Sequence, residues 1–483
     1  MDVKLLYTNP PKVEVKDLTE LDVGKHEVII ASYSNLQEYY DMLGISKNAV
    51  GNIIDRKLEG FIPTSKGLIY VIEDLKAPMK NLEARYTFAK GVKSLRDRIR
   101  DLAVISPNKE LLYDTILGSL LASYKFELFK KDKQRVLDKI TFYVEGGVYE
   151  ENIKKAESIA SGVYVARDIG NLPANHADPS KLEKIITELF KSYSDVRVEV
   201  LDSKDLKEKG LNGILAVGSG SKVEPRMIII EYKGAGWGEE DNKVAIIGKT
   251  VTFDSGGLDL KPHEGMDEMK YDKCGGGVAA GIIVSMHMLK SINKIISILP
   301  AVENLPSNNP YKPRDVIRMY NGVTVEVTNT DAEGRLTIAD AMSYAELELK
   351  ARRIIDIATL TGAVVVALGS EAAGVAGTDI DFINKLLEIN KLTGERFWEY
   401  PLYDEYKDYL ESKVADIANS GGREASLCTS GAFLKEFVEK ALWTHIDVAG
   451  VAWVKKKGPK TPVYEEGATG WGLESIVRVI EQF

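Results

Sequence analysis

Two carboxylates lie two residues apart, as Asp331 and Glu333, in the segment 329–336 (NTDAEGRL). This segment falls between an expected strand at 323–327 and an expected helix beginning near Leu336, which is where α/β proteins tend to place their sites. Farther upstream, Asp254 and Asp272 are each expected in a loop between a strand and a helix. The two acidic pairs together predict a site for two cations.

The four carboxylates set the kind of metal chemistry. They supply about four negative charges, which would neutralise two divalent ions in a partly desolvated pocket and would repel one another without them. Hard oxygen ligands suit Mg or Mn, and carboxylates also bind Zn. Because the chain has only 5 His and 2 Cys, we expect a carboxylate-rich site.

One basic residue, Lys249, follows the apolar run 244–248 and precedes Asp254 in the sequence. Its amine can pair with Asp254 as an ammonium ion or, if neutral, donate its lone pair to a metal. Two neighbouring dications would depress its pKa and favour the second role. The spacing alone leaves both roles open.

A longer pattern includes these residues. It comprises 247–257 (IGKTVTFDSGG), 261–262 (KP), 266–272 (MDEMKYD), 329–336, 358–363 (ATLTGA) and 467–470 (GATG). In order and spacing it resembles the leucyl aminopeptidase (M17, cytosol aminopeptidase) family over roughly the last two-thirds of the chain. The octapeptide 329–336 is highly specific.

The resemblance implies two divalent cations per subunit, either Mn or Zn, with Mg or Co as further options. One would be held by Asp254, Asp331 (side chain and backbone carbonyl) and Glu333. The other would be held by Lys249, Asp254, Asp272 and Glu333. Bridging by Asp254 and Glu333 suits the separation of about 3.5–4 Å usual in two-metal hydrolases, with a water between the ions as nucleophile.

The same resemblance implies a metal-dependent aminopeptidase that removes the N-terminal residue of short peptides. The substrate α-amine would bind one cation, and the ammonium of Lys261 would help to polarise the scissile carbonyl. Arg335 would hold a bicarbonate ion that acts as general base, because its planar fork grips such an anion bidentately.

A substrate side-chain pocket is implied near Met269, Thr359, Gly362 and the stretch 449–452, and an apolar lining would favour Leu or Met. The family also implies a homohexamer built as a dimer of trimers. Two positions depart from the usual family pattern: Thr250 stands where Gly is common, and His263 where a small residue is frequent. Neither replaces an implied ligand, so they bear on loop geometry and specificity.

Length and composition bound the organisation. We expect two domains from 483 residues of which 44% are hydrophobic: an N-terminal α/β domain (1–150), a linking helix (151–170) and a catalytic domain (171–483). The 2 Cys exclude a disulfide framework, and with no signal peptide or membrane span expected, we predict a cytoplasmic protein. The formal charge of −9 argues against nucleic acid as the main partner.

The expected fold class is α/β, with a small N-terminal α/β domain and a larger catalytic domain whose mostly parallel sheet is flanked by helices. Nearly unbroken apolar strands alternating with helical segments are typical of such a sheet. The expected strands are 26–31, 67–72, 197–200, 227–230, 244–248, 295–299, 323–327 and 353–357, and the expected helices include 111–128 and 152–168.

Other interpretations remain at this point. Two carboxylate-bridged cations also serve phosphoesterases, although their sites frequently include His ligands. A binding or scaffold role that retains only the fold is a third possibility. The glycines 275–277 could cradle a phosphate, but close helix packing is the better interpretation, and Cys274 beside them is expected to be a packing residue.

Overall fold

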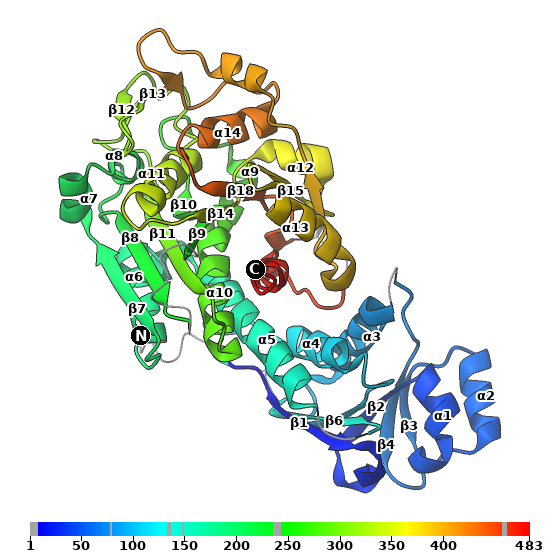
Figure 1. Cartoon of the computed structure of the whole chain (residues 1–483). Coiled ribbons are helices and arrows are strands. Elements are labelled where there is room, and N and C mark those ends of the chain that lie inside the picture. The colour runs from blue at the N-terminus through cyan, green and yellow to red at the C-terminus, as the bar shows by residue number, and fades with distance from the viewer. Residues whose placement is uncertain (1–7, 78–79, 133–136, 147–148, 235–242, 456–460) are drawn as a thin grey trace.

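The computed structural model describes residues 8–77, 80–132, 137–146, 149–234, 243–455 and 461–483. Two sheets follow one another along the chain and are joined by the long helix α5, Glu150–Asn171 (Figure 1). In the view of Figure 1, the first sheet lies below α5 and the second above it.

The first sheet has six strands in the order β1-β6-β5-β2-β4-β3, all parallel to their neighbours except β3. Its strands are β1 (Lys12–Asp17), β2 (Val28–Ser32), β3 (Gly60–Pro63), β4 (Leu68–Ile72), β5 (Asp101–Ile105) and β6 (Lys139–Val144). Helices α1 (Tyr33–Leu43) and α2 (Lys47–Asp55) cover one face, and α3 (Lys80–Leu95) and α4 (Leu112–Ser123) cover the other. Successive residues of β2 alternate between the two cores: Ile29 lies in the first and Ile30 in the second.

The second sheet has nine strands, eight of them in the order β16-β15-β18-β14-β9-β11-β8-β7, and β10 pairs with β11. Its centre, β18-β14-β9-β11, is parallel, whereas β7, β8 and β15 join antiparallel. The sheet is therefore mostly parallel, as predicted. The strands are β7 (Val196–Leu201), β8 (Arg226–Tyr232), β9 (Lys243–Gly248), β10 (Thr250–Asp254), β11 (Lys294–Asn304), β14 (Arg353–Ala358), β15 (Ala373–Gly377), β16 (Phe397–Glu399) and β18 (Leu442–Asp447).

Helices cover both faces of this sheet, which explains why its central strands are apolar at nearly every position. One core lies against α5, α6 (Pro179–Phe190), α10 (Cys274–Leu289), α13 (Ile380–Thr393) and α15 (Leu473–Ile480). The other lies against α7 (Ser203–Lys209), α8 (Asn212–Gly218), α11 (Gly334–Leu347) and α14 (Ser426–Lys435). Shorter elements are α9 (His263–Met266), α12 (Gly362–Leu368), β19 (Trp453–Val454) and β20 (Gly467–Ala468).

Glycines allow α5 and α10 to cross in close contact. A Cβ on Gly162 would lie 2.5 Å from the carbonyl oxygen of Gly281, and one on Gly277 would lie 2.7 Å from that of Ala166. Likewise a Cβ on Gly275 would lie 2.1 Å from the carbonyl oxygen of Ile357. Close packing is thus the role of the glycines 275–277, as the sequence favoured over a phosphate cradle.

Two expectations are wrong. The predicted strand 323–327 does not join the large sheet: β13 (Thr324–Glu326) forms a separate sheet with β12 (Val316–Arg318) and β17 (Ile417–Ala418). The alternation of polar and apolar residues in β13 (Thr-Val-Glu) is typical of a strand with only one apolar face, whereas the central strands of the large sheet are apolar on both. Asp254 was expected in a loop but is the last residue of the short strand β10, whose backbone pairs with β11.

Candidate active site

The predicted site residues gather at one edge of the large sheet, where its central parallel strands end. Lys249 follows β9, Asp254 ends β10, and Thr359 follows β14. Asp272 and Glu333 come just before α10 and α11, and both helices pack against β9 and β14. This is the edge at which open α/β sheets generally bind their ligands.

Three buried carboxylates converge there. Asp254, Asp272 and Glu333 each offer an oxygen within 4.8 Å of the others, a spacing that could hold a metal ion. Asp331 joins them through Lys261, whose ammonium lies 2.8 Å from Asp254 Oδ2 and 2.5 Å from Asp331 Oδ1. Among the described residues, the cluster contains no histidine.

Lys249 lies inside this cluster. Its Nζ is 2.8 Å from Asp272 Oδ1 and 2.9 Å from Glu333 Oε1, and it donates to the carbonyl oxygen of Thr359 at 2.8 Å. The side chain reaches this position because residue 334 is Gly, whose missing Cβ would lie 2.3 Å from Lys249 Cε. Burial alone would lower the pKa of Lys249, but the charges of Asp272, Glu333 and Asp254 outweigh burial and raise it. These contacts are those of an ammonium ion paired with two carboxylates.

The charged forms of three of the carboxyl groups, Asp254, Asp272 and Asp331, are disfavoured where they lie, and their pKa values are raised. Burial raises the pKa of Asp254, and the neighbouring charge of Glu333 raises it further. The same two causes, in the same order, raise the pKa of Asp331 to about 7. Burial also raises the pKa of Asp272 well above its ordinary value, against the attraction of Lys249. So many carboxyl groups in one desolvated place favour a divalent cation.

One oxygen of the cluster has no partner. Asp272 Oδ2 is buried and makes no hydrogen bond among the described residues. A buried, unpaired carboxylate oxygen is costly unless something else binds it. The donor set therefore fits a metal ion.

Three further side chains fix the carboxylates and the loop beside them, and two of these, Asn304 and Asp447, were missed by the sequence analysis. Asn304 donates from Nδ2 to Asp254 Oδ1 at 2.8 Å and to the Thr330 carbonyl oxygen at 3.0 Å. The Thr359 hydroxyl donates to Asp272 Oδ1 at 2.7 Å. Asp447 accepts from the Leu360 N–H at 3.1 Å and the Thr361 hydroxyl at 2.7 Å, which fixes the loop after β14. The available signal was the polar residue at the last position of each strand, Asn304 in β11 and Asp447 in β18.

The cluster lies at the wall of a pocket of about 680 Å³. Its other walls come from the predicted substrate-pocket residues Met269, Thr359 and Gly362, together with Val365 and Trp453. Lys261 lines the pocket as well, so the structure brings together nine of the ten predicted site residues: Lys249, Asp254, Lys261, Met269, Asp272, Asp331, Glu333, Thr359 and Gly362.

Arg335 lies behind the pocket and is not among its lining residues. Its guanidinium donates to the Asn419 carbonyl oxygen and to Ser430 Oγ, both at 2.6 Å, whereas Nε is buried without a partner among the described residues. Burial lowers the pKa of Arg335 to about 10, so it stays cationic at neutral pH. One donor of the fork is therefore still available to a small anion.

Cys274, next to the cluster, is a packing residue, as expected. It is buried at the start of α10, and burial raises the pKa of its thiol to about 12. A thiol with that pKa is not a nucleophile at neutral pH.

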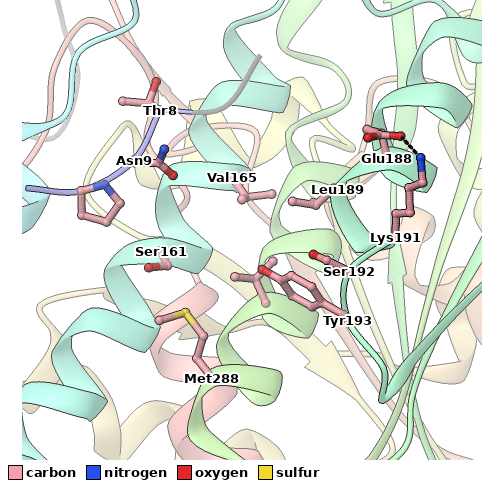
Figure 2. Close-up of a pocket in the computed structure, with 12 residues that line it drawn as sticks. Thr8, Asn9, Ser161, Val165, Glu188, Leu189, Lys191, Ser192, Tyr193 and Met288 are labelled. Carbon is pink, nitrogen blue, oxygen red and sulfur yellow. Dashed lines mark hydrogen bonds and ion pairs between the residues drawn. The ribbon is translucent and has the colours of Figure 1, made fainter. Parts of the chain in front are cut away.

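A separate cavity of about 780 Å³ lies between α5, α6, α10 and residues 8–10, away from the acidic cluster (Figure 2). Its two charged side chains, Glu188 and Lys191, pair with each other at 3.3 Å. The rest of its lining is small, polar or apolar, so this cavity offers no comparable chemistry.

The comparisons with known proteins agree with this geometry. Residues 164–477 match the model of the cytosol aminopeptidase family, catalytic domain. A probable cytosol aminopeptidase of Cenarchaeum symbiosum is 40% identical over 390 residues, 80% of this chain and 77% of that one. A probable cytosol aminopeptidase of Aeropyrum pernix is 36% identical over 99% of both chains. The solved structure of the bottromycin maturation enzyme BotP in complex with Mn has a TM-score of 0.83 and 25% identity, over 95% of this chain and 99% of that one.

The acidic cluster at the end of the mostly parallel sheet could hold a metal ion, and the family match identifies the class of protein as a metal-dependent hydrolase. The chain belongs to the cytosol aminopeptidase (M17) family and is a metallo-exopeptidase. Peptides are its substrate class.

Proposed function

We propose that this protein removes the N-terminal residue of short peptides by a two-metal mechanism, with Lys249, Asp254, Asp272, Asp331 and Glu333 as the metal ligands. The observation that carries this proposal is the buried cluster Asp254–Asp272–Glu333 with its unpaired Asp272 Oδ2. Two bound divalent cations would supply Lewis-acid polarisation of the scissile carbonyl and an acidified water as nucleophile. Mn and Zn suit this donor set, and Mg or Co are further options.

Lys249 changes partners in this proposal. In the metal-free cluster its ammonium neutralises Asp272 and Glu333. Cations beside it would lower its pKa and let the neutral amine act as a ligand. The sequence left the roles of ion-pair partner and ligand open; the ion pairs support the first role, and the second is proposed for the metal-loaded protein.

Lys261 is suited to act on the substrate. Its side chain is 20% exposed, lines the pocket, and is held by Asp254 and Asp331. Burial would lower its pKa, but these carboxylates and Glu333 raise it, so it is a cation at neutral pH. A fixed cation facing the pocket stabilises negative charge that develops on the carbonyl oxygen.

Arg335 is proposed to hold bicarbonate. The unpaired Nε is the feature that fits an anion there, and bicarbonate, when bound, would supply the general base. Arg335 itself orients that anion and keeps the positive charge that holds it in a buried place.

The pocket wall formed by Met269, Val365 and Trp453 supports a preference for apolar N-terminal residues such as Leu or Met. We also propose a cytoplasmic homohexamer, a dimer of trimers, as the family resemblance implies. Among the described residues, no helix combines the length and apolar character needed to cross a bilayer. Light scattering that gives a monomer mass would contradict the assembly.

The test is a substrate panel on protein stripped of metal and then reloaded with Mn²⁺ or Zn²⁺. We expect reloading to restore hydrolysis of leucine p-nitroanilide but not of its N-acetyl derivative, because acetylation removes the free amine. Faster turnover of p-nitrophenyl phosphate than of leucine p-nitroanilide would instead indicate a phosphoesterase. Equal rates on the free and acetylated substrates would contradict an exopeptidase.

A further inference from the structure

The pocket that holds the acidic cluster presents one more carboxylate, which the metal site does not use. Glu268 lines this pocket beside Met269, and its side chain is only 19% exposed. The Trp453 indole N–H donates to its Oε1 at 3.1 Å, and Lys455 Nζ lies 3.3 Å from the same oxygen. Within the described ranges no hydrogen bond reaches Oε2, so half of this carboxylate remains able to accept one.

Trp453 fixes Glu268 in place. Its ring stacks on Tyr271, with centroids 5.6 Å apart and an angle of 11° between the planes. The indole therefore has little freedom to rotate, and its N–H keeps the carboxylate oriented. A preorganised group that loses little entropy on binding is suited to specific recognition.

The wall leading to Glu268 is apolar. Met269, Val365 and Trp453 line the same pocket, so the aliphatic part of a long side chain can pack against them. The amino or guanidinium group at the end of a Lys or Arg side chain then needs an acceptor, and Glu268 supplies one. An apolar wall that ends in a fixed carboxylate is complementary to a basic side chain.

Lys455 competes for the same carboxylate, but only weakly. Its side chain is 50% exposed, and its contact with Glu268 is an ion pair without a hydrogen bond among the described residues. Ion pairs of this kind are weak because solvent screens them and a flexible side chain must be ordered. A substrate cation that brings its own packing can displace the Lys455 ammonium.

We propose that Glu268 is a specificity-determining residue, which lets this pocket take peptides with an N-terminal Arg or Lys alongside apolar ones. The inference rests on the proposed aminopeptidase function of the same site. It adds basic N-terminal residues to the apolar ones, such as Leu or Met, that the resemblance implies are favoured.

The test compares kcat/KM for the aminomethylcoumarin derivatives of arginine, leucine and glutamate in the metal-loaded protein. In the wild type we expect the arginine substrate to react within about tenfold of leucine and far faster than glutamate. Glu268→Gln keeps the shape but removes the charge, and should lower the arginine-to-leucine ratio about tenfold. Lys455→Met removes the competitor and should raise the ratio about threefold.

Glu264→Gln is the matched control, since Glu264 is exposed in the neighbouring helix α9 and does not line the pocket. A ratio unchanged in both Glu268→Gln and Lys455→Met would overturn the proposal, and so would a wild type that prefers glutamate. If no substrate is hydrolysed, the aminopeptidase function fails, and calorimetric binding of free arginine and leucine still tests Glu268. Weaker arginine binding in Glu268→Gln, with wild-type arginine binding in Glu264→Gln, supports the inference. Equal arginine affinity in the wild type and Glu268→Gln contradicts it.

Discussion

At the scale of single residues, Thr359 shows how a neighbouring side chain can orient a proposed metal ligand. Its hydroxyl donates to Asp272 Oδ1 at 2.7 Å, and its carbonyl oxygen accepts from Lys249 Nζ at 2.8 Å. One residue thus contacts two proposed ligands. Groups that orient ligands in this way commonly affect metal affinity as much as they affect turnover.

We predict that Thr359→Val weakens Mn²⁺ binding about 10- to 100-fold, because it removes the hydroxyl and keeps the shape. Thr359→Ser retains the hydroxyl and should bind Mn²⁺ nearly as the wild type does. Competition with a chelator measures the affinity of each protein. Wild-type affinity in Thr359→Val would show that the hydrogen bond does not orient Asp272.

That the four acidic residues would gather was predictable from residue types and spacing, because each comes at or just after the end of an expected strand or just before an expected helix. The assignment of individual ligands, Lys249 included, came only from the family resemblance. The supporting contacts were not predictable. That Asn304 bonds Asp254 depends on the pairing of β10 with β11, and sequence spacing does not give that register. Arg335 was foreseen as a site residue, but its position behind the pocket depends on Asn419 and Ser430, far along the chain.

At the scale of elements, α5 and α10 cross so closely that a side chain as small as a methyl group would not fit between them. Glycines at the crossing make this approach possible. A Cβ on Gly162 would meet Ser285 Oγ at 2.1 Å and the Gly281 carbonyl oxygen at 2.5 Å. The second contact is with backbone, so it cannot be relieved by a rotamer change. Because α10 begins beside Asp272, this crossing also positions the acidic cluster.

We predict that Gly162→Ala lowers the free energy of unfolding by about 1–3 kcal/mol through overpacking. Gly51→Ala is the matched control, since Gly51 lies within α2 and its Cβ would meet nothing within 4 Å. That change should instead raise the free energy of unfolding by about 0.5–1 kcal/mol. Denaturant titration measures both values, and equal effects would contradict the role given to Gly162.

A buried acid near the start of α15 makes stability depend on pH. Glu395 accepts from the Gly472 and Ser475 N–H groups at 2.9 and 3.0 Å. Burial, and then repulsion from Glu474, raise its pKa from 4.5 to about 7. Between these values the folded protein holds a proton that the unfolded chain releases, so the free energy of unfolding falls as pH rises through this window.

Glu395→Gln should remove that dependence. We predict that the variant gains stability relative to the wild type as pH rises from about 5 to about 7, and that the difference then levels off. Denaturant titrations of both proteins at about pH 5, 6, 7 and 8 measure this difference in the free energy of unfolding. Parallel pH profiles for the two proteins would show that Glu395 is ionised throughout.

The elements themselves were largely foreseen, since buried parallel strands and long helices have strong hydrophobic patterns. The predicted helices 111–128 and 152–168 correspond to α4 (Leu112–Ser123) and α5 (Glu150–Asn171). The assignment of 323–327 to the large sheet was wrong. The sequence of a short strand indicates that it is extended, but it does not indicate which strand it pairs with. Pairing is decided by contacts distant in sequence.

At the scale of the whole molecule, a buried charge network joins the two halves. Arg85 of α3 lies 2.6 Å from Asp114 of α4 and 2.8 Å from Glu474 of α15. Its Nη1 also donates to the Thr393 carbonyl oxygen at 3.0 Å. We propose a division into an N-terminal domain (1–150), a linking helix (151–170) and a catalytic domain (171–483), in which this network holds the outer two together.

We predict that Arg85→Met lowers the free energy of unfolding by about 3–5 kcal/mol, because it leaves Asp114 and Glu474 buried without a partner charge. Arg56→Met, at an exposed position in the same half of the chain, should change it little. Denaturant unfolding followed by circular dichroism measures both. Equal stability of the two variants would show that the network does not hold the halves together.

The account depends most on the buried carboxylates acting together as the metal centre, and Glu333→Ala tests this most directly. Metal content and leucine p-nitroanilide turnover are measured together in Mn-loaded protein, with the exposed Glu208→Ala as control. We predict two ions per wild-type chain, loss of at least one in Glu333→Ala, and a fall in turnover of about a thousandfold with the fold intact. Two retained ions and wild-type turnover in Glu333→Ala would contradict the account.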